Sequence, residues 1–233
     1  MTGCPYLAIP LGFIILCPIS MASVLVPEWD GRPGTTSALF SFATGDKNVS
    51  PTSSRNPYGS VTMLVENETV WGAGWMDPAD PYGLTRGSGG GSWDLGQHGL
   101  ISIMVPVSEI GRESVNMIDL FMHVIWYRGP MGTPGYEMRG QTPSYQNLAD
   151  LFVQADGPGA WYGTTWEATF DNVTDNELTV SIQAPWNGAV VESIAIYTRT
   201  TPVPEPSSLL LLGLAAGGFP FLRKRKIPGD SAK

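Results

Sequence analysis

The chain has 233 residues and a formal net charge of −8 at pH 7, from 13 basic and 21 acidic side chains. An acidic chain repels nucleic acid rather than binding it, so we exclude a nucleic-acid partner. The two cysteines, Cys4 and Cys17, both lie near the N-terminus. The rest of the chain therefore has no disulfide, thiol nucleophile or thiolate metal site.

The first predicted element is an export signal over residues 1–22. Residues 7–19 form an apolar run, and Ser20 and Ala22 supply small residues at the positions that a signal peptidase reads. We therefore predict passage through the general export machinery and cleavage after Ala22. The alternative interpretation of this run is a buried N-terminal strand. Cleavage would leave one domain, residues 23–201, which is long enough to bury a core of its own.

The domain shows the alternation of apolar and polar residues that is typical of β-strands, in short stretches separated by Gly, Pro, Asn and Asp. In one stretch Leu178, Val180 and Ile182 share a face. The pattern predicts an all-β fold, a single β-sandwich or jelly-roll-like domain. The eight expected strands are residues 37–43, 60–65, 101–105, 116–127, 151–155, 166–170, 178–183 and 190–198.

The connections between these strands are rich in turn-forming residues. Residues 171–177 are predicted to form a hairpin, because Asn and Asp suit turns. Short helical turns are expected at residues 107–112 and 144–148. The longest predicted loops are residues 72–92 and 129–146, and long loops on a sandwich commonly carry binding residues.

The eight tryptophans are the most suggestive feature of the domain. An exposed aromatic ring can stack on a sugar ring, whereas a buried ring fills the core of a β-sandwich. Trp126 and Trp166 lie on expected strands and are assigned to the core. The candidate glycan contacts are the tryptophans in or beside expected loops, namely Trp71, Trp75, Trp93 and Trp161.

The sequence offers no convincing catalytic or metal-binding constellation. Asp119 and His123 share a face of one expected strand but lie about 13 Å apart, so they cannot pair directly. Phe121 shares that face, and His123 is therefore predicted to be packed. With His98 as the other histidine, a zinc site is not expected. We predict no catalytic residue and no cofactor, apart from Ca²⁺ held loosely by the acidic turn at residues 77–80.

Residues 202–233 have three parts in a fixed order. The linker of residues 202–208 contains Pro204, Glu205 and Pro206, and its prolines favour an extended conformation. Residues 209–222 are uncharged and apolar; with the two preceding serines they would make roughly 24 Å of helix, against about 30 Å of bilayer hydrocarbon. The basic tail, residues 223–233, begins with Arg223, Lys224, Arg225 and Lys226.

The order of these parts predicts a membrane helix with a basic stop. Four consecutive cations are expected to hold the C-terminal end on the cytoplasmic side and to attract anionic headgroups. The bulk of the chain then lies on the far side of the membrane. The alternative, a buried core helix, should show a polar face, and residues 209–222 show none.

The ordered set of Pro204-Glu205-Pro206, a leucine-rich run and a basic cluster resembles the PEP-CTERM sorting signal of exported bacterial proteins. The resemblance covers about 25 of the 233 residues and leaves the domain unassigned. It implies that exosortase, a membrane-embedded cysteine peptidase, recognises the Pro-Glu-Pro motif. It also implies transient anchoring in the inner membrane by the C-terminal helix, followed by transfer to the cell surface or extracellular matrix.

The sequence therefore predicts an exported surface or matrix protein with a structural or adhesive role. The first alternative is a carbohydrate-binding module for exopolysaccharide. The second is a secreted glycan hydrolase on a jelly-roll scaffold, with carboxylates such as Asp94, Asp119 or Glu167. Paired catalytic carboxylates need a defined separation, which a sequence does not give.

Overall fold

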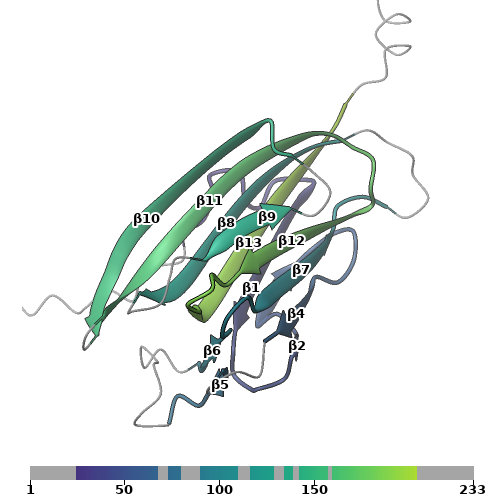
Figure 1. The fold of residues 1–233 in the computed structure, drawn as a ribbon. Helices are drawn as coiled ribbons and strands as arrows, with labels where there is room; N and C mark the ends of the chain where they lie inside the picture. Colours follow the sequence, from purple (N-terminus) through teal and green to yellow (C-terminus); the bar gives the residue numbers. More distant parts are fainter. Residues whose placement is uncertain are drawn as a thin grey trace, which may run out of the picture.

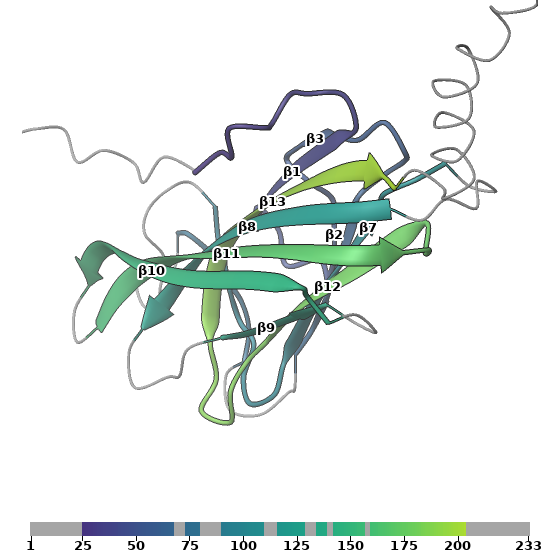
Figure 2. The ribbon, with the colours of Figure 1, turned by 90° about the horizontal axis from the view of Figure 1, so that it is seen from above.

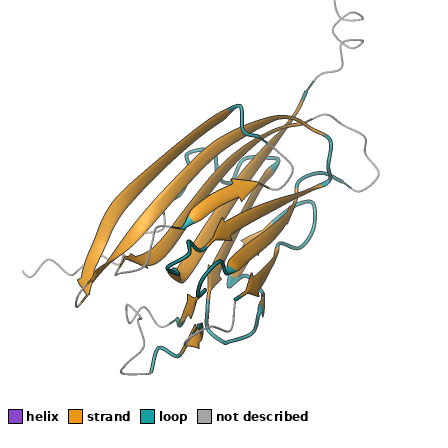
Figure 3. Cartoon of the chain, viewed as in Figure 1, coloured by secondary structure: helices purple, strands orange, loops and turns teal. Residues whose placement is uncertain are grey.

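The computed structural model describes residues 25–67, 73–79, 90–109, 116–128, 134–138, 142–156 and 159–203. Within these ranges the chain forms β-strands and no helix, arranged as two antiparallel sheets (Figures 1 and 3). The all-β, two-sheet prediction is confirmed. No helix of the described ranges is long and apolar enough to span a bilayer. The predicted export signal and sorting helix fall outside these residues.

The larger sheet has eight strands, and its main path runs β10-β11-β8-β13-β1-β3. A short extension is formed by β6, which pairs with β13, and by β5, which pairs with β6. Seen from above, β10, β11, β8 and β13 lie side by side (Figure 2). The strands are β1 (Thr35–Ser41), β3 (Ser53–Arg55), β5 (Gly74–Met76), β6 (Ser92–Asp94), β8 (Asn116–Arg128), β10 (Tyr145–Asp156), β11 (Gly159–Val173) and β13 (Val190–Pro202).

The smaller sheet has five strands in the order β2-β4-β7-β12-β9. Its apolar residues alternate along β7 and β12 and face the larger sheet. Ile103 of β7 lies opposite Val180 of β12, and both are fully buried. The strands are β2 (Asn48–Val49), β4 (Thr62–Glu66), β7 (Leu100–Pro106), β9 (Gly135–Met138) and β12 (Glu177–Gln183).

One continuous hydrophobic core lies between the two sheets. Phe40 of β1, Trp126 of β8 and Trp166 of β11 enter it from the larger sheet, and the alternating apolar residues of β4, β7 and β12 enter it from the smaller one. The assignment of Trp126 and Trp166 to the core is confirmed, since they are 0% and 1% exposed. Burial of such a face is the main favourable contribution to the stability of a β-sandwich.

The predicted hairpin at residues 171–177 is wrong. β11 pairs with β10 and β8 in the larger sheet, whereas β12 pairs with β7 and β9 in the smaller one. The register of β11 against β8 shifts after Phe170, and Asn172 adopts a φ of 58° there. Asn tolerates this left-handed conformation, which redirects the chain from one sheet to the other.

Three further expectations about local structure need correction. Residues 144–148 form no helical turn, because β10 begins at Tyr145. The predicted loops at residues 72–92 and 129–146 contain β5 and β9, which are too short to show alternation in the sequence. In the predicted turn at residues 107–112, the described part, residues 107–109, is not helical.

The larger sheet also buries part of its outer face, the face turned away from the smaller sheet. Phe121, Ala195 and Tyr197 form a second small cluster there, against which Trp29 and Leu39 pack. Trp29 belongs to the segment before β1, which crosses this face. That segment and the sheet beneath it enclose the candidate site.

Candidate functional site

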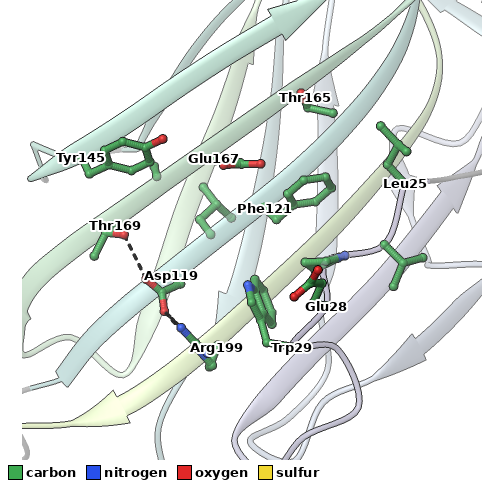
Figure 4. Close-up of a pocket in the computed structure, with 14 residues that line it drawn as sticks. Leu25, Glu28, Trp29, Asp119, Phe121, Tyr145, Thr165, Glu167, Thr169 and Arg199 are labelled. Atoms are coloured by element: carbon green, nitrogen blue, oxygen red, sulfur yellow. Dashed lines mark hydrogen bonds and ion pairs between the residues drawn. The ribbon is translucent and has the colours of Figure 1, made fainter. Parts of the chain in front are cut away.

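A cleft of about 500 Å³ lies between residues 25–29 and the outer face of the larger sheet (Figure 4). This volume is within the usual range for a small-molecule site. One wall is formed by Leu25, Val26, Pro27, Glu28 and Trp29. The floor is formed by outward-facing residues of β8, β10, β11 and β13.

The floor is a product of strand register. Tyr145 of β10 lies opposite Thr169 of β11, Thr169 lies opposite Asp119 of β8, and Asp119 lies opposite Arg199 of β13. Four strands thus contribute one residue each to a single row across the sheet. The next row continues two residues along, where Glu167 lies opposite Phe121. Because side chains alternate between faces, both rows point into the cleft.

Asp119 is the polar centre of the first row. Thr169 Oγ1 donates a hydrogen bond to Asp119 Oδ1 at 2.9 Å, and Arg199 donates from Nε at 2.9 Å and from Nη2 at 2.6 Å to Asp119 Oδ2 (Figure 4). Charge-assisted hydrogen bonds of this kind are short and orient both groups. Both carboxylate oxygens of Asp119 therefore have protein partners already.

Trp29 is held over the floor by charge and by packing. The guanidinium carbon of Arg199 lies 5.5 Å from the centre of a Trp29 ring, a cation–π contact. Asp30 accepts a hydrogen bond from Arg55 of β3, and Thr200 N donates to Gly34 O at 3.0 Å. These contacts fix the segment at the C-terminal end of the residues that wall the cleft.

The charge of the cleft is negative. Glu28 and Glu167 add two carboxylates to the neutral Asp119–Arg199 pair, and no further Asp, Glu, Lys, Arg or His lines the cleft among the residues that the structure describes. The indole of Trp29 and the phenol of Tyr145 supply aromatic surface on two sides (Figure 4). A cleft of this composition can bind a neutral or cationic ligand that offers hydroxyl or amino donors to carboxylates.

The four candidate glycan tryptophans do not meet in this cleft. Trp93 and Trp161 are 3% and 0% exposed, so their assignment as glycan contacts is wrong. Trp75 is half-buried, and its Nε1 donates to Phe42 O at 3.0 Å. An added Cβ at Gly91 would lie 2.5 Å from Trp75 Nε1, which shows how closely the backbone packs on this ring. Trp71 lies outside the described residues.

Sequence reasoning missed Trp29, which lines the cleft, and Trp186, which is exposed. Trp29 follows a predicted export signal and lies outside every expected strand, so no alternation marked it. Trp186 is 71% exposed and lies between β12 and β13, away from the cleft. Trp93 and Trp161 were assigned to loops because β6 and the start of β11 show too little alternation of apolar and polar residues to be recognised as strands.

His123 is packed, as predicted, with 4% of its surface exposed. An added Cβ at Gly163 would lie 2.5 Å from His123 Nε2, so the ring rests on the backbone of β11. Within the described part of the chain, no three His, Cys, Asp or Glu side chains gather as a metal site would require. In the described part of the acidic turn, residues 77–79, Ala79 N donates a hydrogen bond to Asp77 Oδ1 at 2.8 Å.

The three carboxylates of the hydrolase alternative are not gathered at one place. Asp119 and Glu167 line the cleft, whereas Asp94 lies on β6 and does not. Burial raises the pKa of Asp94 above its ordinary value, and a hydrogen bond from Gly96 N at 2.9 Å partly opposes that effect. Because both oxygens of Asp119 are occupied, the geometry gives the Asp119–Glu167 pair no specific support as an acid–base pair.

The fold and the cleft define a β-sandwich domain with an aromatic, acidic cleft on one outer face. The family model of the PEP-CTERM protein-sorting motif matches residues 202–226. The chain therefore carries a PEP-CTERM sorting motif, which indicates an exported protein that is sorted by an exosortase-type system. The matched residues begin where β13 ends, at Pro202, and do not extend into the rest of the domain. Comparison with curated proteins and with solved structures gives no significant match.

Proposed function

We propose that this exported protein is an adhesive component of the cell surface or extracellular matrix that binds glycan chains in the Trp29–Tyr145 cleft. The observation that carries the proposal is the placement of Glu167 and Asp119 on the cleft floor between the aromatic rings of Tyr145 and Trp29. Aromatic faces suit the apolar face of a sugar ring, and carboxylates accept hydrogen bonds from its hydroxyl groups. The negative cleft favours neutral or amino-bearing sugars over acidic ones.

Calorimetric titration tests this proposal, with the protein recovered in the form that its exporting cell releases. The panel contains neutral, amino-bearing and acidic polysaccharides. Neutral or amino-bearing chains should bind, and Glu167→Gln and Trp29→Ala should each weaken binding about tenfold, about 1.4 kcal/mol. Circular dichroism must show that both variants remain folded.

Trp186→Ala is the matched control, because it removes an exposed tryptophan that does not line the cleft. It should leave the affinity unchanged. Absence of heat with every neutral and amino-bearing glycan would reject the proposal. If Trp186→Ala lost binding and Trp29→Ala did not, glycans would bind outside the cleft, and the proposed site would be rejected.

We also propose the individual steps of sorting. Signal peptidase removes residues 1–22, residues 209–222 then anchor the chain in the inner membrane, and the exosortase releases it after recognising Pro204-Glu205-Pro206. The support is the order of motif, apolar run and basic cluster within the matched segment. Mass spectrometry of the protein from its own host should find a C-terminus near Glu205 and an N-terminus at Ser23.

A charge change in the motif gives the sharper test of sorting. Glu205→Ala should leave the full C-terminal tail on membrane-bound protein, because it removes the carboxylate between the two prolines. Asp230→Ala removes a carboxylate beyond the matched residues and should be processed normally. Normal trimming of Glu205→Ala would contradict recognition through this side chain.

A further inference from the structure

The β10 strand ends the larger sheet with a long open edge. It is the first strand of the path β10-β11-β8-β13-β1-β3, and no strand of the described residues pairs with its other side. β10 has 12 residues, whereas the strands at the other sheet ends, β3, β5, β2 and β9, have 3, 3, 2 and 4. Natural proteins protect such edges with short strands, prolines or lysines. β10 contains no Pro, Lys or Arg.

Large apolar side chains are exposed on both faces of this strand. Tyr145 and Leu151 lie on the outer face and are 54% and 50% exposed. Leu148 and Phe152 lie on the other face and are 51% and 63% exposed. A single strand thus carries four of the nine large hydrophobic residues that are exposed in the described residues. Such a concentration marks an interaction surface.

We propose that β10 pairs antiparallel with β10 of a second copy of this chain, and that the pairing joins two larger sheets into one continuous sheet. Symmetry restricts the register. The two-fold axis of such a dimer is perpendicular to the sheet, so it leaves each side chain on its own face. Opposite residues on neighbouring strands share a face, so one residue of β10 must lie opposite itself.

The bulge in β10 narrows the choice of that residue. The register of β10 against β11 shifts between Phe152 and Gln154, so the regular part is residues 145–152. A pairing centred on Leu148 or Ala149 makes the fullest use of it. Centring on Ala149 would place Leu148 opposite Asp150 of the partner subunit, an apolar group against a charge.

Centring on Leu148 makes the edge self-complementary. Leu148 then lies opposite Leu148 of the partner subunit, and Tyr145 lies opposite Leu151 of the partner subunit. Gln146 lies opposite Asp150 of the partner subunit, where its amide can donate to the carboxylate. No two charges of the same sign face each other, and such cross-strand pairs stabilise antiparallel sheets.

The dimer would place both clefts on one side of the continuous sheet, because the two-fold axis preserves faces. Tyr145 lines the cleft, so Leu151 of the partner subunit would lie beside the cleft rim. Two clefts on one side can bind a repeating polymer at two points, which raises the effective affinity. This last consequence rests on the proposed glycan binding, whereas the pairing of the β10 strands does not.

A cysteine trap tests the register directly. Leu148→Cys should give a disulfide-linked dimer on mild oxidation of the released protein, because directly opposite Cα atoms lie within disulfide range. The matched control is Gln146→Cys, whose copies would be about 13 Å apart along the strands and should not link. The parent protein is the blank, because Cys4 and Cys17 lie within residues 1–22, which the released protein is proposed to have lost. Equal linking in Gln146→Cys would overturn the register.

Charge variants test whether the dimer exists without a covalent link. Leu148→Lys and Leu148→Glu each place like charges directly opposite, so each should weaken the dimer at least tenfold in sedimentation equilibrium. An equimolar mixture of the two variants should recover it. Leu148 is half exposed, so both variants should fold, as circular dichroism can check. If the parent protein stays monomeric at about 100 μM, the proposal is overturned, even if a different molecule covers the edge of β10.

Discussion

The two faces of the larger sheet are organised by different physical rules. On the inner face, Ile118, Met122 and Trp126 of β8 pack into one continuous core with the smaller sheet. On the outer face of the same strand, Asp119 and Phe121 lie two residues apart, one in a hydrogen-bonded row and the other in a small apolar cluster. Hydrophobic burial is non-directional, whereas the outer face depends on the register of four strands.

Neighbouring substitutions on β11 should separate the two faces most clearly. Trp166→Ala empties a fully buried position of the inner face and should lower the free energy of unfolding by about 3–5 kcal/mol. Glu167→Gln, one residue on, changes only the outer face and should lower it by less than about 0.5 kcal/mol. Chemical denaturation measures both. A similar loss in the two variants would show that the faces are not distinct in stability.

A buried hydrogen bond links the inner core to the edge strand. Trp126 Nε1 donates to Thr164 Oγ1 at 2.8 Å, and Thr164 Oγ1 donates to Asp150 Oδ1 of β10. Thr164→Val keeps the side-chain shape but leaves the buried indole N–H without its acceptor. The expected loss in the free energy of unfolding is about 1–3 kcal/mol.

Thr165→Val is the matched control for this bond, since it makes the same change on the outer face. Thr165 Oγ1 donates to Ala149 O at 3.4 Å, a longer and therefore weaker hydrogen bond than that of Thr164 with Trp126. Its substitution should cost less than about 0.5 kcal/mol in urea or guanidinium unfolding. If Thr165→Val cost as much as Thr164→Val, the Trp126 bond would not be the reason for the loss.

The residues that form the core between the two sheets could be predicted from the sequence, because the alternation within a single strand is enough to identify them. Leu178, Val180 and Ile182 show it in β12, and all three are buried. The connection at residues 171–177, which joins strands of different sheets, could not be predicted, because alternation does not tell which sheet a strand joins. The chain changes sheet near Asn172, which has a left-handed conformation, but Asn occurs in many turns and does not by itself mark such a change.

The candidate site was largely hidden from sequence reasoning for the same reason. Tyr145, Thr169, Asp119 and Arg199 are spread along the chain, with Asp119 and Arg199 80 positions apart, and only pairing in register places them in one row. The exposure of individual tryptophans was equally hidden. Trp161 lies near the start of a strand, yet it is buried in a cluster with Ile125, Tyr127 and Val190, and its ring centre lies 5.4 Å from that of Tyr127.

Removing the cation of the first row should have a moderate effect. Arg199→Gln removes two hydrogen bonds to the half-buried Asp119, and it also removes the cation–π contact with Trp29. Because both groups keep some contact with water, we expect a loss of about 1 kcal/mol in the free energy of unfolding. The double variant Asp119→Asn/Arg199→Gln should recover part of it, since no unpaired carboxylate remains. Additive losses in the cycle would contradict the coupling.

The smallest expected effect depends on pH and concerns Asp94, which pairs with Val190 where β6 meets β13. Burial raises its pKa, so the folded protein binds this proton more readily than the unfolded chain does. The charged carboxylate therefore costs stability at neutral pH, and the cost disappears as the pH falls through the raised pKa towards the ordinary value of 3.8. Asp94→Asn removes the charge and retains an oxygen that can accept from Gly96 N.

Asp94→Asn should consequently raise the Tm at pH 7 slightly, on the order of 1 °C, and leave it unchanged below pH 3.8. Scanning calorimetry at several pH values measures the difference. Asp171→Asn, which changes an exposed aspartate of β11, should leave the Tm unchanged throughout. A gain from Asp94→Asn that persisted at low pH could not come from charge burial. It would place the effect in the packing of Asp94 against the turn at Gly96 and would remove desolvation as its cause.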